Sequence, residues 1–179
     1  MTPAPQDPTP ALWMSLQERL AGYLAARGLL ASDFALSDRG GEELGRLRVY
    51  GRRGADLEAG VITAAIERGA GSRYTMLDSD GRVILEETAG SGDVSEVRRG
   101  DRVYEVWLAL LRNAAVARSS GGAEVARVAG GLTNRSYEAF FDAGEEGALP
   151  LALFLLYRII ALRRRAFLTG TERGGASSA

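Results

Sequence analysis

Alternation of apolar and polar residues, interrupted by glycine turns, is the dominant pattern of this 179-residue chain. Three such turns lie about forty residues apart, at Gly40-Gly41, Gly81 and Gly121-Gly122. Glycine lacks a Cβ and adopts the positive φ that tight hairpin turns require, so each block is predicted to be a pair of antiparallel strands. The repeat predicts a sheet built from successive hairpins. A period near forty also fits propeller blades, but three copies are too few to close a propeller.

Other segments carry weaker strand patterns. In residues 55–68, alanine-rich helix propensity competes with a β-branched run near the centre, and we favour a strand. Residues 102–107 alternate cleanly and are predicted to form a strand, while residues 108–113 fit either a helix or a continued strand. Residues 137–141 are predicted to form another short strand.

An amphipathic helix is predicted near the N-terminus, over residues 10–28. Its apolar stripe recurs every four residues, at Leu12, Leu16, Leu20 and Leu24. Residues 1–9 are proline-rich and residues 170–179 are rich in glycine, serine and alanine, so both are expected to be disordered. Residues 33–168 are therefore predicted to form a single β-rich domain.

The strongest helical signal is at residues 149–168. From residue 148 to 162 the chain is apolar on every side of a helical wheel except at Arg158, and Arg163-Arg164-Arg165 follow. A helix without a polar face must be surrounded by protein or by lipid. Because the continuous apolar run is shorter than the ~20 residues that a bilayer core needs, we predict a buried core helix. Membrane insertion of residues 148–162 remains the alternative.

Composition narrows the possible chemistry. The chain has no His and no Cys, which excludes the usual zinc sites, thiol catalysis and Ser-His-Asp triads. Its 22 basic residues are all arginine and its net charge is −1, which disfavours nucleic-acid binding. No cofactor is expected. The N-terminus lacks the basic and apolar regions of a signal peptide, so we expect a cytoplasmic protein, with peripheral membrane attachment as an open alternative.

The candidate ligand-binding residues are clustered arginines. If they meet on one surface, their guanidinium groups can bind phosphates, such as those of anionic lipid headgroups. The alternative is that they are solvated and paired with the 23 acidic residues. The residues are Arg52, Arg53, Arg98, Arg99, Arg163, Arg164 and Arg165.

Acidic residues near Gly81 imitate part of a calcium-binding loop. Asp78, Asp80 and Glu87 have a spacing similar to the middle and end of an EF-hand loop, but Met76 occupies the first ligand position. An ordinary hairpin turn is the favoured interpretation. No other carboxylate pair is brought together by its spacing, so we do not expect an enzyme, and one that uses only carboxylates and arginine is a remaining alternative.

The order of these features resembles the phospholipid scramblase and tubby-like (LURP-one-related) group. The resemblance covers about residues 33–168 and is carried by Tyr74–Leu85, Ala123–Val128, Tyr137-Glu138 and the apolar run 149–162. It implies a closed β-barrel around a hydrophobic C-terminal helix. The group includes lipid- and membrane-associated proteins and many bacterial ones without an assigned role, and the lysine-dependent phosphoinositide site of tubby proteins has no counterpart here.

Two functions are consistent with these features. The first is a non-enzymatic, β-rich α+β domain that binds a lipid, a membrane surface or a protein partner, with the clustered arginines as contacts. The second is an α+β protein-interaction or chaperone-like module. In that case the leucine stripe of residues 12–24 would form a homodimer or partner interface.

Overall fold

The computed structural model describes residues 20–28, 32–91 and 93–171, without the side chains of residues 72, 89, 91 and 165–171. This part of the chain forms strands, three short 3-10 turns and one long helix. They are β1 (Gly22–Gly28), β2 (Asp33–Ser37), β3 (Glu43–Val49), η1 (Gly51–Arg53), β4 (Gly54–Ala59), β5 (Ile62–Arg68), η2 (Ala70–Ser72), β6 (Tyr74–Asp78), β7 (Val83–Ser91), β8 (Val94–Arg99), β9 (Arg102–Ala109), η3 (Leu110–Arg112), β10 (Ala114–Ser119), β11 (Glu124–Gly130), β12 (Ser136–Phe141) and α2 (Ala148–Thr171).

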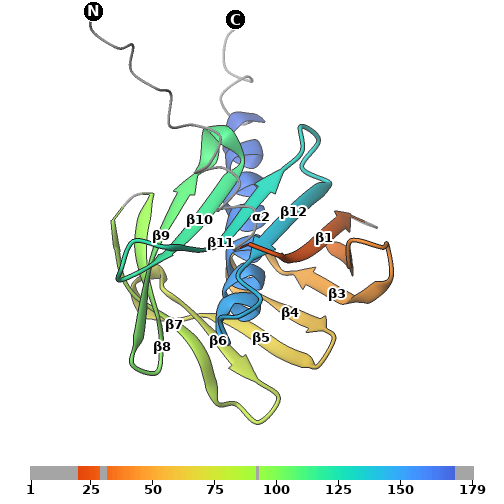
Figure 1. The fold of residues 1–179 in the computed structure, drawn as a ribbon. Coiled ribbons are helices and arrows are strands. Elements are labelled where there is room, and N and C mark those ends of the chain that lie inside the picture. The colour runs from red at the N-terminus through yellow and green to blue at the C-terminus, as the bar shows by residue number, and fades with distance from the viewer. Residues whose placement is uncertain (1–19, 29–31, 92, 172–179) are drawn as a thin grey trace, which may run out of the picture.

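The strands form a closed antiparallel barrel in which each strand pairs with its neighbours in sequence (Figure 1). The barrel closes where β1 pairs with β12, with Leu24 opposite Ala139. Closure gives every strand two partners, so no row of backbone N–H and C=O groups is left at an open edge. This arrangement confirms the predicted β-rich fold built from successive hairpins.

Helix α2 occupies the centre of the barrel (Figure 1). The seven consecutive residues from Leu151 to Tyr157 are each at most 1% exposed. Because an α-helix turns once every 3.6 residues, seven consecutive buried residues cover every direction around its axis. The prediction of a core helix is therefore confirmed. No helix in the described residues has the length and apolar character needed to cross a bilayer.

Every second side chain along a strand points into the barrel, and these side chains fill the space between the barrel wall and α2. In β9, Tyr104, Val106 and Leu108 are buried and face the barrel interior, whereas Trp107 faces outward. Residues 102–107 thus form the predicted strand, and Ala109 ends it before the 3-10 turn of residues 110–112. The exposed fraction of Trp107 is 46%, so this aromatic side chain lies on the outer wall.

The predicted glycine turns are confirmed, and more turns of the same kind lie between them. Gly41, Gly81 and Gly122 have φ values of 85°, 77° and 80°. Gly60 and Gly100, midway between them, also have positive φ and turn β4 into β5 and β8 into β9. The true hairpin spacing is therefore about twenty residues, half of the predicted repeat. Residues 55–68, for which a strand was favoured, form two strands that meet at Gly60.

The N-terminal helix predicted for residues 10–28 is not supported, because residues 22–28 form strand β1. Leucines four residues apart satisfy a two-residue period as well as a helical one, since four is a multiple of two. Leu24 and Ala26 accordingly face the barrel interior. Leu12 and Leu16, like the predicted disordered leader and residues 172–179 of the predicted tail, lie outside the described residues.

Candidate functional site

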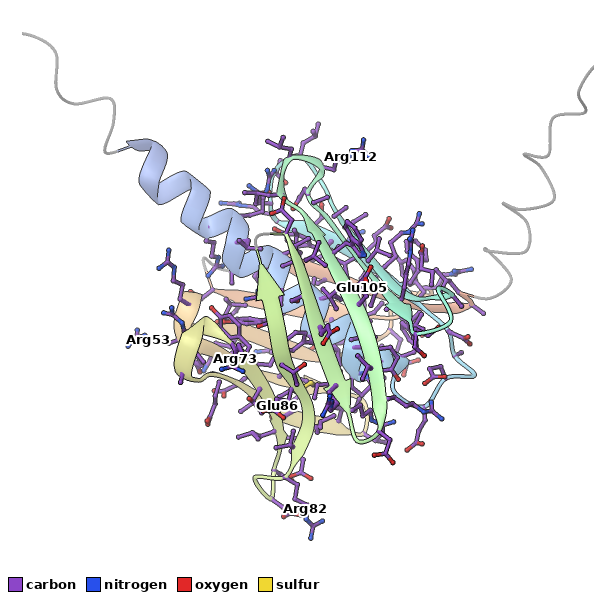
Figure 2. The ribbon with its side chains drawn as sticks, turned by 90° about the vertical axis from the view of Figure 1, so that its left-hand side faces the viewer. Arg53, Arg73, Arg82, Glu86, Glu105 and Arg112 are labelled. Atoms are coloured by element: carbon purple, nitrogen blue, oxygen red, sulfur yellow. The ribbon has the colours of Figure 1, made fainter. Side chains whose placement is uncertain are left out.

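Up-and-down topology places successive connections at alternate ends of the barrel. At one end α2 emerges, and we call the described connections there the helix-exit rim: residues 32, 50–53, 69–73, 93, 110–113 and 131–135, with Arg163 and Arg164 of α2. At the other end α2 begins, and we call its connections the hairpin rim: residues 38–42, 60–61, 79–82, 100–101, 120–123 and 142–147. Figure 2 shows Arg112 at the first end and Arg82 at the second.

Charge separates strongly between these rims. The helix-exit rim has one carboxylate among its described residues, Asp93, and carries the arginines Arg52, Arg53, Arg73, Arg112, Arg135, Arg163 and Arg164. The hairpin rim has two arginines, Arg39 and Arg82, and carries the carboxylates Asp38, Glu42, Asp80, Asp101, Asp142, Glu145 and Glu146. The near-neutral total charge thus conceals one basic end and one acidic end.

Four exposed arginines of the basic end lie on its 3-10 turns and loops. Arg52 and Arg53 on η1, Arg112 on η3, and Arg135 are all exposed, and none of them forms an ion pair with another described residue. The η1 turn is anchored to the core because the Tyr157 hydroxyl donates a 3.0 Å hydrogen bond to the Gly51 carbonyl. Burial raises the pKa of Tyr157 above its ordinary value, so this hydroxyl stays protonated as a donor.

Arg163 ties two loops of the helix-exit rim to the end of α2. Its Nε atom donates to Asn134 Oδ1 at 2.9 Å, and its Nη1 atom donates to the Leu110 carbonyl at 3.3 Å. Asn113 completes the connection, donating from Nδ2 to the Gly131 carbonyl at 3.0 Å. Arg163 therefore positions the rim, in addition to contributing positive charge there.

Arg164 is partly withdrawn into the protein. Its guanidinium lies 5.7 Å from the centre of the Phe34 ring and 3.5 Å from Ser32 Oγ. Desolvation by this burial lowers the pKa of Arg164. The side chain of Arg165 is not among those described.

The predicted arginine groups do not all meet on one surface. Arg52, Arg53, Arg163 and Arg164 share the helix-exit rim, whereas Arg98 and Arg99 precede the Gly100 turn of the hairpin rim. Arg99 Nη2 there forms a 3.1 Å ion pair with Glu146. Sequence reasoning missed Arg112 and Arg135, which are isolated in sequence and join the basic rim only through the fold.

The three residues of the calcium hypothesis take separate roles in the structure. Asp78 Oδ1 accepts hydrogen bonds from the backbone N–H groups of Asp80 and Arg82, at 2.9 and 2.8 Å, and so caps the hairpin turn. Glu87 is buried in the middle of β7, away from that turn, and binds Arg158 of α2 at 3.2 Å. The fold does not bring these carboxylates together, and the described residues contain no cluster of three acidic side chains suited to a metal.

A shallow depression on the outer wall across β3, β4 and β5 is the main alternative site. Its volume is about 530 Å³. Several charged groups that line it already have partners: Arg48 binds Asp33 at 2.8 Å, Arg46 lies 3.6 Å from Glu43, and Asp56 accepts a 2.7 Å hydrogen bond from the Tyr50 hydroxyl. This depression therefore offers less unpaired charge than the helix-exit rim.

Comparison with known proteins assigns no family. No protein-family model matches the chain, and no curated protein matches it. Among solved structures, an X-ray structure of a protein from Arabidopsis thaliana is similar at 11% identity with a TM-score of 0.35, over 80% of this chain and 94% of that one.

Proposed function

We propose that this chain is a non-enzymatic binding module that docks on anionic membrane surfaces through its helix-exit rim. The observation that carries the proposal is the segregation of charge, with arginines gathered at one end of the barrel and carboxylates at the other. Each basic side chain close to an anionic bilayer contributes about 1 kcal/mol of binding free energy. Arg52, Arg53, Arg112 and Arg135 are exposed and form no ion pair with a described residue, so their guanidinium groups are available to lipid phosphates.

We also propose that the chain belongs to the scramblase and tubby-like group. Support comes from the closed barrel around an apolar C-terminal helix, the architecture that the sequence resemblance implied. The membrane proposal does not depend on this assignment, because the arginines are taken from their positions in this structure.

Vesicle co-sedimentation tests the proposed function. The wild-type protein should bind vesicles of phosphatidylcholine with phosphatidylserine, and should bind pure phosphatidylcholine weakly. Raising the ionic strength from about 0.1 M to about 1 M shortens the Debye length from about 10 Å to about 3 Å, so binding should be lost. The quadruple variant R52A/R53A/R112A/R135A should bind at least about a hundredfold more weakly, given about 1 kcal/mol per residue.

The control removes two arginines at the opposite end of the barrel. The double variant R82A/R98A changes exposed side chains of the hairpin end and should bind as the wild type does. If that control loses as much binding as the quadruple variant, the rim assignment is wrong. If the wild-type protein does not bind anionic vesicles at low salt, the proposed function itself is wrong.

A further inference from the structure

Two leucines project fully into solvent from the helix-exit rim. Leu111 lies on η3 and is 98% exposed, and Leu132 lies in the loop between β11 and β12 and is 100% exposed. A single exposed leucine is ordinary in a folded protein. These two lie in loops that are bonded to each other, and each loop also carries an exposed arginine, Arg112 or Arg135.

The loops that carry these leucines are held in place by side-chain hydrogen bonds. Asn113 adopts a left-handed conformation with φ of 49°, which ends η3, and its Nδ2 atom reaches Gly131 O and Asn134 Oδ1 at 3.0 and 3.4 Å. Arg163 bonds to both loops from α2. Because the loops are already ordered, they would lose little conformational entropy if the leucines moved from water into an apolar environment.

We propose that Leu111 and Leu132 insert into the outer part of an anionic bilayer, so that the barrel stands on the membrane by its helix-exit rim. This inference rests on the proposed function and adds an apolar anchor to the electrostatic contact. Apolar side chains bordered by arginines are the combination by which interfacial proteins hold anionic membranes. Charge complementarity favours such a bilayer as the occupant, because Asp93 is the one carboxylate among the described residues of the rim.

The first test compares substitutions of exposed apolar side chains at opposite ends of the molecule. The double variant L111D/L132D should bind vesicles of phosphatidylcholine with phosphatidylserine much more weakly than wild type, by roughly tenfold or more for each leucine. Val61 is a matched control, since it is fully exposed at 101% but lies on the hairpin rim, so V61D should bind normally. Both variants change exposed side chains and should keep the wild-type circular-dichroism spectrum and melting temperature.

The second test measures depth in the bilayer. With Trp13 and Trp107 replaced by phenylalanine, L111W provides a single fluorescent reporter at the proposed anchor and V61W provides one at the opposite rim. Phospholipids brominated on the acyl chains should quench the fluorescence of the L111W reporter in vesicle-bound protein and leave the V61W reporter unchanged.

The outcomes separate this inference from the function on which it rests. Salt-sensitive binding that is unaffected by L111D/L132D, with no quenching of the L111W reporter, would overturn the insertion and leave electrostatic docking in place. Absence of vesicle binding by the wild-type protein would overturn both, and would point to a protein partner for this rim.

Discussion

Glu87 and Arg158 form a buried ion pair between the barrel wall and the central helix. Their side chains are 4% and 15% exposed. Glu87 Oε2 also accepts the backbone N–H of Tyr74 at 3.1 Å, and the Arg158 guanidinium stacks 4.4 Å from the centre of the Tyr74 ring. Arg158 is the one charged residue in the apolar stretch 148–162, and its charge is thus compensated inside the protein.

Glu87→Ala is expected to destabilise the fold by about 3 kcal/mol, because it leaves a buried guanidinium without its counter-charge. The double variant E87L/R158M should lose less than the sum of the losses in E87L and R158M, since neither partner is then left alone. Urea unfolding of the wild type, E87L, R158M and E87L/R158M measures this coupling. Strict additivity of the two changes would show that the pair does not join helix and wall.

Element by element, the sequence patterns differ in how well they predict the structure. Helix α2 is predictable because residues 148–157 have no polar face. A helix of this kind must be kept from water, so its burial can be expected before its neighbours in the fold are known. Hairpins are predictable where paired turn residues precede glycine, as at Gly81. Gly60 and Gly100 are missed as hairpin turns because neither follows an Asp or a Ser: Ala59 precedes Gly60, and Arg99 precedes Gly100. Residues 22–28 are mistaken for helix because their leucines fit both periods.

A substitution in the core helix α2 tests whether the barrel wall encloses it. Phe154 is completely buried between α2 and the barrel wall, so Phe154→Ala should lower the free energy of unfolding by about 3–5 kcal/mol. Leu111→Ala removes a similarly large apolar side chain from an exposed position and should change it by less than about 0.5 kcal/mol. Denaturant titration distinguishes the two. Equal, small effects would mean that the helix is not enclosed.

Across the whole molecule, the parity of the strand count decides which arginines share a surface. Arg52 and Arg53 follow β3, whereas Arg98 and Arg99 end β8, so an odd and an even strand deliver them to opposite rims. Sequence patterns identify both groups, but they do not fix the number of strands between them. Each unrecognised turn, such as the one at Gly60, divides one predicted strand into two and so changes the count by one. The basic rim is therefore a property of the closed barrel that composition and local motifs do not contain.

The separation of charge also gives the molecule a preferred direction of approach. A net charge of −1 would predict weak repulsion from an anionic surface if the charges were evenly spread. With the arginines at one end and the carboxylates at the other, the field attracts the helix-exit rim and repels the hairpin rim. The attraction acts over about one Debye length, roughly 8 Å at physiological ionic strength, so it orients the barrel close to the membrane.

Hydrogen–deuterium exchange with and without anionic vesicles shows directly whether the barrel binds end-on by one rim. We predict slower exchange on binding at residues 50–53, 110–113 and 131–135, with no change at the turns around Gly60, Gly81 and Gly100. Slower exchange at the turns of the hairpin rim, or along the outer wall in place of the helix-exit rim, would contradict it.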